Sequence, residues 1–399
     1  MFDFGKAVGG LGKWEKSRGL RAPSKSRPSP GSTTLTETHP ESNPGNLRMF
    51  TYVPASTADH QALVVVLHGC GQTAAGYNHG AGWSTLADRF GFALLLPEQQ
   101  RSNNPGGCFN WFEPGDIQRD RGEAASIRAM VAKMVRENGI DPRRVFVTGL
   151  SAGGAMTSAM LACYPEVLAA GAIIAGLPYG AAGNAQEAFA SMFQSPARPA
   201  REWGDLVRRA APHHNGPWPR VSVWHGNADK TVIPSNAREI LKQWIDVHGV
   251  STAPSLETAV DGYPRQVWRN KAGEDLIESY SITHMAHGTP LATGDADSEC
   301  GAAGPFLLDA GISSSFHIAG FFGLTQAGAR SVSSTKKDMA AAAARRPAGK
   351  LVDAPQLQIL HGEVSNGVEE DRSAKPVPPR IDIGAVINKA LEAAGLLRR

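Results

Sequence analysis

Short apolar runs alternate with stretches of helical spacing through the middle of the chain, from about residue 48 to residue 325. Residues 62–67 (ALVVVL) and 90–97 (FGFALLLP) are continuous apolar runs, as buried parallel strands have. Residues 122–137 carry apolar side chains three and four positions apart, which predicts a helix with one buried face. By the same criteria we expect strands at 49–53, 144–148, 169–175, 220–224 and 276–282, and helices at 152–163 and 235–247.

Strands that alternate with helices of roughly 10–15 residues indicate an α/β fold, with a mostly parallel sheet and helices on both of its faces. In such sheets the functional residues lie at the carboxyl ends of the strands. Turns that directly follow a predicted strand are therefore the first place to look for chemistry.

The two ends of the chain differ from this block. Residues 1–47 include a stretch rich in Pro, Ser and Thr with few large aliphatic residues, which predicts an N-terminal extension and linker. Residues 329–399 are Ala-rich and also short of core-forming residues, which predicts a low-complexity C-terminal extension. We expect both extensions to be disordered or loosely packed beside a single folded domain at 48–328.

The last segment, residues 381–399, places apolar residues along one face of a helix. It ends in two arginines, where the helix dipole favours positive charge. Two interpretations remain open for this amphipathic helix. Either it docks on its own domain, or it contacts a partner or an apolar surface.

Composition narrows the class of protein. The chain has 399 residues, of which 42% are hydrophobic and 19% charged, so it can bury a sizeable core and is not disordered throughout. Its 40 Lys and Arg against 37 Asp and Glu leave a net charge of +3, which is too balanced for a dedicated nucleic-acid-binding protein. No apolar run approaches the roughly 18 residues that a transmembrane helix needs.

The sequence leaves the cellular compartment open. The N-terminal residues contain no apolar core followed by a small-residue cleavage site, so they do not resemble a Sec signal peptide. A cytoplasmic location and export by another route are both compatible with such a start. Four cysteines, Cys70, Cys108, Cys163 and Cys300, permit three full pairings or none, and they are too few for a disulfide scaffold.

The strongest chemical signal is the pattern GLSAG at residues 149–153, which lies between a predicted strand and a predicted helix. This setting is that of a nucleophile elbow, a turn that exposes its serine above the sheet edge. Side chains at Gly149 or Gly153 would collide with the strand or helix beside them. We therefore predict Ser151 as a nucleophile, with the helix N-terminus stabilising negative charge. The alternative is a glycine-rich helix start with Ser151 as its N-cap.

A serine nucleophile needs a base to take its proton and an acid to orient that base. In α/β-hydrolases the acid and then the base follow the serine along the chain. We expect Asp229, in the turn after the predicted strand at 220–224, to be the acid, although a solvated turn aspartate would have the same pattern. His287, in a loop with glycine and proline, is the expected base. His284 would then pack its loop or bind substrate.

The oxyanion formed by such a serine requires two backbone N–H donors. Ala152, directly after the nucleophile, would supply one of them. Cys70 or Gly71, in the His-Gly turn that follows the strand at 62–67, would supply the second. The alternative for this turn is an ordinary connection between a strand and a helix.

Two further features are less specific. Trp111, in the segment CFNWF, would either wall an apolar acyl pocket or anchor its loop by packing. His284 and His287 are three positions apart, but no third ligand and no H-E-x-x-H or C-x-x-C pattern accompanies them. We therefore expect no metal site.

Taken in order along the chain, GCGQT, GCFNWF, GLSAGG, HGNADKTV and MAHGTP resemble the polyhydroxybutyrate depolymerase family of esterases. That family is related to feruloyl and acetylxylan esterases of the α/β-hydrolase fold. The resemblance covers about residues 48–324 and assigns the triad roles to the same Ser, Asp and His as above. It also implies a disulfide between Cys70 and Cys108, and most of the family is extracellular.

The resemblance implies hydrolysis of carboxylic esters through an acyl-enzyme, without a cofactor. The expected substrates are short 3-hydroxyalkanoate oligomers or polymer. Polymer-degrading members usually add a β-rich substrate-binding domain, so the Ala-rich C-terminal extension favours oligomers over crystalline polymer. A feruloyl or acetylxylan esterase would share the triad and differ in the acyl pocket. A non-catalytic protein that binds granules or a partner through a hydrolase scaffold is the alternative of another class.

Overall fold

The computed structural model describes residues 34–55 and 61–325 of the chain. They form a 10-stranded sheet in the order β1-β2-β4-β3-β5-β6-β7-β10-β9-β8 and a 2-stranded sheet of β11 and β12. The strands are β1 (Thr36–Thr38), β2 (Arg48–Tyr52), β3 (Gln61–Leu67), β4 (Ala93–Glu98), β5 (Ile140–Leu150), β6 (Ala170–Ile174), β7 (Arg220–Gly226), β8 (Leu256–Val260), β9 (Tyr263–Arg269), β10 (Asp275–Ile282), β11 (Thr289–Leu291) and β12 (Leu307–Asp309). From β4 to β10 neighbouring strands are parallel, whereas the outer pairs are antiparallel.

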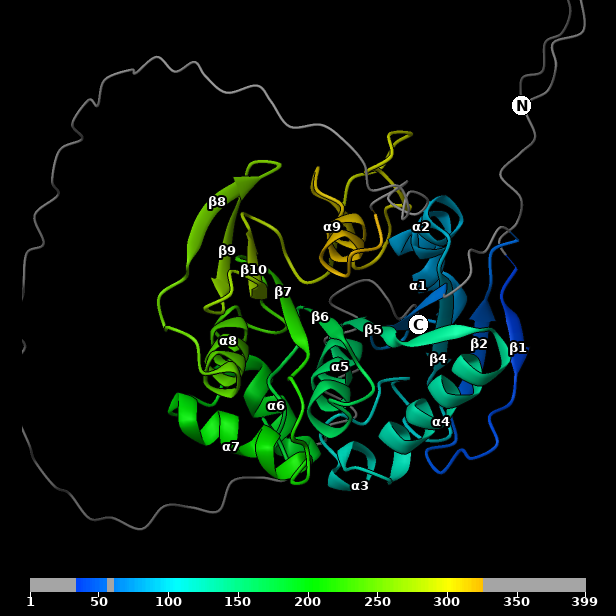
Figure 1. Cartoon of the computed structure of the whole chain (residues 1–399), viewed down its shortest axis with the longest axis horizontal. Helices are drawn as coiled ribbons and strands as arrows, with labels where there is room; N and C mark the ends of the chain where they lie inside the picture. The colour runs from blue at the N-terminus through cyan, green and yellow to red at the C-terminus, as the bar shows by residue number, and fades with distance from the viewer. Residues whose placement is uncertain (1–33, 56–60, 326–399) are drawn as a thin grey trace, which may run out of the picture. The chain divides into compact units, whose positions relative to one another are not determined.

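Helices cover both faces of the large sheet (Figure 1). They are α1 (Ala74–Ala81), α2 (Trp83–Phe90), α3 (Pro114–Ile117), α4 (Gly122–Glu137), α5 (Ala152–Cys163), α6 (Ala185–Gln194), α7 (Ala200–Ala210), α8 (Ser235–His248) and α9 (Ser314–Phe321). Buried side chains of α4, α5 and α8 belong to one apolar cluster, and those of α1, α2 and α9 belong to another. No helix within the described ranges is long and apolar enough to cross a bilayer.

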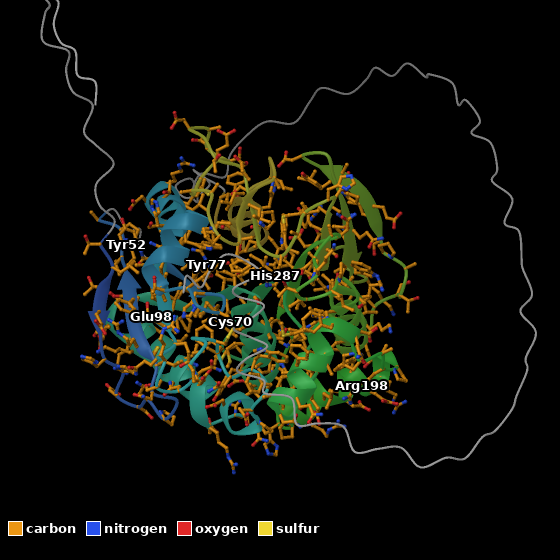
Figure 2. The ribbon with its side chains drawn as sticks, turned by 180° about the vertical axis from the view of Figure 1, so that it is seen from behind. Tyr52, Cys70, Tyr77, Glu98, Arg198 and His287 are labelled. Carbon is orange, nitrogen blue, oxygen red and sulfur yellow. A yellow bond between two sulfur atoms is a disulfide. The ribbon has the colours of Figure 1, made fainter. Side chains whose placement is uncertain are left out.

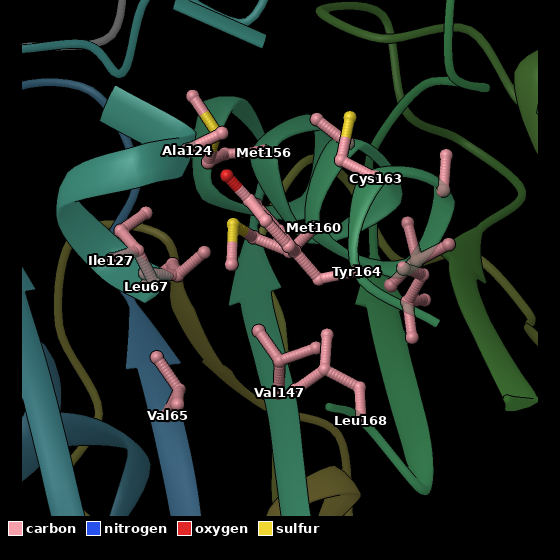
Figure 3. Packing of buried hydrophobic residues seen from close by; sticks show 14 of the residues in the cluster. Val65, Leu67, Ala124, Ile127, Val147, Met156, Met160, Cys163, Tyr164 and Leu168 are labelled. Carbon is pink, nitrogen blue, oxygen red and sulfur yellow. The ribbon is translucent and has the colours of Figure 1, made fainter. Parts of the chain in front are cut away.

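Strand β3 shows how the sequence builds this two-sided core. All 7 of its residues are buried. Leu63, Val65 and Leu67 belong to the cluster under α4 and α5, while Val64 and Val66 belong to the cluster under α1 and α2. Figure 3 shows Val65 and Leu67 on the side of the sheet that α4 and α5 cover. Because each fully buried aliphatic side chain contributes about 1.5–3 kcal/mol, the central strand is held from both faces.

Helix α5 lies unusually close to the sheet because its first turn is made of small residues. All 12 of its residues are buried. A Cβ added to Gly153 would collide with the carbonyl oxygens of Leu67 and His68, and one added to Gly154 would collide with that of Ile174. The N-terminus of α5 is therefore fixed against the carboxyl ends of β3 and β6.

The periodic segments agree with the structure. The helices predicted at 122–137, 152–163 and 235–247 fall on α4, α5 and α8, and the predicted strands fall on β2 to β7 and on β10. The patterns did not predict the remaining elements, among them β8 and β9. Most residues of β8 are exposed, so this edge strand carries no clear apolar alternation.

The expected domain boundary at residue 48 is corrected by the structure. β1 pairs with β2, with Thr36 opposite Thr51, and Leu47 is a buried member of the core. The composition concealed this because an edge strand such as TET is held by backbone hydrogen bonds and needs no apolar side chains. The extension at 329–399, with its predicted helix at 381–399, lies outside the described residues.

A buried carboxylate ties together β7, β9 and β10. Glu278 of β10 is only 2% exposed. Its Oε1 accepts a hydrogen bond from the Ser222 hydroxyl of β7 at 2.7 Å, and its Oε2 pairs with Arg265 of β9 at 2.7 Å. The three strands are thus joined by one charge that water cannot reach.

We expect Arg265→Met to lower the free energy of unfolding by about 3–5 kcal/mol, because it leaves the Glu278 charge buried without its partner. Arg269→Met is the matched control, since it removes a pair with Asp275 that is far more exposed than Glu278, and should cost only about 0–1 kcal/mol. Urea unfolding of both variants measures the difference. Equal losses would contradict the role given to Glu278.

Candidate active site

Ser151 stands in a sharp turn between β5 and α5. Its backbone angles, φ 57° and ψ −116°, lie in a region that residues with a side chain rarely adopt. The turn is held by a hydrogen bond from the Ser151 N–H to the Ile174 carbonyl oxygen at 2.9 Å. A Cβ added to Gly149 would collide with the carbonyl oxygen of Gly153. Both glycines of the sequence pattern are therefore required for the chain to turn here.

Asp229 and His287 form a buried hydrogen-bonded pair. Asp229 follows β7 and His287 follows β10, and Nδ1 of His287 lies 2.7 Å from Oδ2 of Asp229. The other carboxylate oxygen, Oδ1, accepts hydrogen bonds from the N–H groups of Thr231 and Val232, at 2.8 Å and 2.9 Å. The carboxylate is thus oriented from both of its oxygens.

These contacts determine the ionisation of Asp229 and the position of the proton on His287. Burial alone would raise the pKa of Asp229, but hydrogen bonds from His225 and His287 outweigh burial and lower that pKa well below its usual range. Asp229 is therefore ionised at neutral pH. As an acceptor it fixes the proton of His287 on Nδ1, which leaves the proton-accepting lone pair on Nε2.

The turns that carry Asp229 and His287 are also joined through their backbones. The N–H of Ala228 donates to the carbonyl oxygen of Met285 at 3.0 Å. A Cβ added to Gly226 would collide with that same oxygen, so the two turns are in direct contact. Gly226 thus allows the turn that carries Asp229 to pack against the turn that carries His287.

Ser151 lies at the same edge of the sheet as this pair. The strands β5, β6, β7 and β10 are adjacent and parallel, so their carboxyl ends point the same way. The register aligns those ends, pairing Leu150 with Ile174, Ile174 with Trp224 and Trp224 with Tyr280. The structure therefore brings the three residues predicted as a triad to one edge, in chain order Ser, Asp, His.

The turn after β3 is built around a buried histidine. The Gln72 N–H donates to the Gly69 carbonyl oxygen at 3.2 Å, and Gly71 has a φ of 72°, which favours glycine at this position of a turn. Nδ1 of His68 lies 2.7 Å from the same carbonyl oxygen, and Nε2 of His68 accepts from the Gln99 N–H at 3.1 Å. Burial lowers the pKa of His68, so the neutral ring donates from Nδ1.

The hydrogen bonds to the Gly69 carbonyl oxygen also fix the direction of the Cys70 N–H, which belongs to the same peptide group. In a trans peptide the N–H points opposite to the preceding carbonyl, so the Cys70 amide points away from the His68 side of the turn. A disulfide joins Cys70 to Cys108 with an S–S distance of 2.15 Å, which is the pairing that the family resemblance implies. Figure 2 labels Cys70 and His287, both toward the middle of its view.

The loop that carries Cys108 and Trp111 is anchored on a buried carboxyl group. Glu123, in the first turn of α4, is 1% exposed. It accepts hydrogen bonds from the Gln99 side-chain amide at 2.5 Å and from the Asn110 N–H at 2.9 Å. The same amide of Gln99 donates to the Cys108 carbonyl oxygen at 2.9 Å. Burial raises the pKa of Glu123 to about 8.

An apolar cluster adjoins the nucleophile turn. Trp111 is buried and packs edge-on against Phe112, with ring centroids 5.6 Å apart. The cluster also contains Ala152, Leu177 and Val232. Side chains from the loops after β4, β6 and β7 therefore form an apolar wall next to the residue that follows Ser151.

His284 lies apart from the hydrogen-bonded pair. It is an exposed residue with a φ of 60°, and its backbone N–H donates to the Asn227 side-chain oxygen at 2.7 Å. Sequence patterns did not predict His225, Gln99 or Glu123 as parts of the site. The one signal was the position of His225, four residues before Asp229 in the same segment. In the described part of the chain, no cluster of His, Cys, Asp and Glu could hold a metal ion.

Comparison with known proteins shows which family has this arrangement. The family model described as esterase PHB depolymerase matches residues 47–262. The chain is 46% identical over 282 residues to poly(3-hydroxyalkanoate) depolymerase C of Paucimonas lemoignei, covering 71% of this chain and 68% of that protein. The chain belongs to the PHB depolymerase esterase family.

Other relatives of this esterase carry other names. The chain is 37% identical over 254 residues to an acetylxylan esterase of Coprinopsis cinerea, covering 62% of this chain and 67% of that protein. Among solved structures, an acetyl xylan esterase from Aspergillus awamori matches with a TM-score of 0.59 and 28% identity, covering 64% of this chain and 94% of that one. The predictions of the family, of an α/β-hydrolase fold and of a serine carboxylic ester hydrolase are confirmed. The non-catalytic alternative is correspondingly disfavoured.

We expect this esterase to lose stability as the pH rises through about 8. The pKa of Glu123 is raised from 4.5 to about 8, so the folded state holds a proton that the unfolded state releases. The contribution of Glu123 to stability is fully present below about pH 4.5, the pKa in the unfolded chain. It falls as the pH rises from there and is lost once the pH passes about 8, the pKa in the folded protein.

Glu123→Gln is the variant that isolates this effect, because it has no carboxyl group to ionise at this position. Its urea midpoint should change less than that of the wild type between about pH 5 and pH 9. Parallel changes in the two proteins would show that Glu123 does not set the pH dependence.

Proposed function

We propose that this esterase forms an acyl-enzyme on Ser151, with His287 as general base and Asp229 as the acid that orients it. The observation that carries the proposal is the 2.7 Å contact between His287 Nδ1 and Asp229 Oδ2, at the strand ends that also bear the Ser151 turn. A buried, ionised carboxylate behind a histidine is the arrangement that activates a serine.

The reaction follows from these positions. Ser151 Oγ attacks the ester carbonyl carbon while His287 Nε2 accepts the hydroxyl proton. The intermediate collapses with cleavage of the ester C–O bond, and the alcohol leaves with the proton from His287. Water then attacks the acyl-enzyme, His287 takes a proton from it and returns one to Ser151, and the acid is released. Asp229 stays ionised throughout and stabilises the imidazolium.

We assign the oxyanion donors to backbone amides. The N–H of Ala152 is the first amide of α5, and the first amides of a helix have no intrahelical acceptor. The second donor is the amide of Cys70 or of its neighbour Gly71, in the turn that His68 and the disulfide hold. Such donors stabilise the charge that develops on the carbonyl oxygen.

For the substrate we propose short 3-hydroxyalkanoate esters, as soluble oligomers or polymer ends. The apolar wall of Trp111, Leu177 and Val232 suits a small aliphatic acyl group. His284 is exposed, and we assign it to contacts with more distant units of the substrate oligomer. The relative from Paucimonas lemoignei supports this class through its name, poly(3-hydroxyalkanoate) depolymerase C.

An acetylxylan or feruloyl esterase is the second candidate. The observation in its favour is the match to the solved acetyl xylan esterase, which extends over 94% of that chain. Such an enzyme would use the same proposed triad, so the two candidates differ only in the acyl and alcohol groups that they accept.

Ser151→Ala should lower kcat for p-nitrophenyl acetate by several orders of magnitude with an unchanged melting temperature, because it removes the attacking oxygen. Asp229→Asn should lower kcat by about 10⁴-fold, because an amide no longer fixes the tautomer of His287. Ser251→Ala, at an exposed serine outside the site, is the control and should remain fully active. A Ser151→Ala protein with ordinary activity would refute the proposed triad.

Trp111→Ala should lower kcat/KM for a 3-hydroxybutyrate trimer by about tenfold or more, because it opens the proposed acyl wall. The effect on p-nitrophenyl acetate should be smaller, since its acetyl group fills less of the wall. Trp218→Ala, before β7 at the opposite edge of the sheet, is the matched control. Wild-type preference for methyl ferulate over the trimer would favour the second candidate and leave the mechanism intact.

A further inference from the structure

Asp229 has a second histidine beside it that the proposed mechanism does not use. His225, at the end of β7, is 4% exposed. Its Nε2 lies 3.3 Å from Asp229 Oδ2, the same oxygen that His287 Nδ1 contacts at 2.7 Å. One carboxylate oxygen is thus shared by two imidazole rings.

The neighbours of His225 determine which of its nitrogens carries a proton. Nε2 also lies 2.8 Å from the carbonyl oxygen of Val232, and a carbonyl can only accept. Nε2 must therefore bear the hydrogen, which is donated to the Val232 carbonyl oxygen, and Asp229 Oδ2 lies beside it at 3.3 Å. Nδ1 is buried and has no hydrogen-bond partner among the described residues. A proton on Nδ1 would have no acceptor, so the geometry assigns the ring hydrogen to Nε2.

We propose that His225 is a positioning residue for the triad acid. Its polarised Nε2–H, bonded to the Val232 carbonyl oxygen, lies 3.3 Å from Asp229 Oδ2 and favours the orientation of that oxygen toward His287, while Thr231 and Val232 hold Oδ1 through their amides. The carboxylate then cannot rotate without losing hydrogen bonds that no water replaces, because the Asp229 side chain is fully buried.

The hydrogen bond from His225 to the Val232 carbonyl oxygen has a second consequence, at the proposed acyl wall. His225 holds the carbonyl oxygen of Val232, whose side chain packs in the cluster with Ala152 and Trp111. The turn from Asp229 to Val232 is therefore fixed at both ends by one ring. This inference rests on the triad proposed above, since a positioning role requires that Asp229 acts through His287.

The test compares three variants in p-nitrophenyl acetate hydrolysis. His225→Leu and His225→Asn remove the donor at the Nε2 position, because leucine has none and asparagine is too short to reach. Each should lower kcat by about 10-fold to 100-fold, the range expected for one hydrogen bond to a buried charge, with KM nearly unchanged. His225→Gln places an amide N–H close to the Nε2 position and should recover most of kcat.

His248→Leu is the matched control. His248 also bonds a carbonyl oxygen through Nε2, that of Pro219 at 3.0 Å, but it lies at the opposite end of β7. It should lose stability without losing kcat. The proposal is overturned if His225→Leu and His225→Asn keep the wild-type kcat, or if His225→Gln is no better than they are. Persisting activity in Ser151→Ala would refute the triad itself, so the two failures are distinguishable.

Discussion

The close contact between the start of α5 and the ends of β3 and β6 is the constraint on which this active site depends. Gly153 and Gly154 leave no room for a Cβ against the carbonyl oxygens of the sheet, so a larger residue at either position would push the helix outward. Because Ser151 is the last residue before that helix, this contact fixes its position. The parallel register then places the turns that bear Asp229 and His287 at the same edge. Backbone packing thus fixes where a nucleophile can stand, and side-chain chemistry is added to it.

Buried hydrogen bonds connect the loops around this edge. His68 connects the turn after β3 to Gln99, and Gln99 connects onward to Glu123 and to the Cys108 carbonyl. All of these side chains except that of the cysteine donate or accept where water has almost no access, so a lost partner costs about 1–3 kcal/mol. The amide proposed for the oxyanion and the loop that carries Trp111 therefore belong to one network. The disulfide and Gln99 are the two links between them.

The parts of this esterase that could be predicted from its sequence are those whose signal is local. The helices α4 and α5 follow from spacing within each segment, and Ser151 follows from the glycines on either side of it. Asp229 could be selected because it lies in the turn after a strand-like run, and His287 because its loop after such a run contains glycine and proline. The residues that were not predicted act through distant partners: Glu278 bonds a serine 56 positions away, and Glu123 bonds a glutamine 24 positions away. No periodicity within one segment reports such pairs. The edge strands β1 and β8 were missed for a related reason, since mainly their backbones hold them.

Family membership establishes the class of reaction, and the proposed acyl wall is assembled from several loops. Within that wall the positions are not equivalent. Val232 follows the proposed triad acid, Asp229, by three residues. It donates its amide to Asp229 and accepts from His225 through its carbonyl, so a change in the backbone there also disturbs Asp229. Trp111 stands on a separate loop that is held by Glu123 and by the disulfide, and it contacts the wall through its side chain alone. A change of substrate that preserves catalysis is therefore easier to reach from the Trp111 side than from the Val232 side, because only the first leaves the hydrogen bonds of Asp229 untouched.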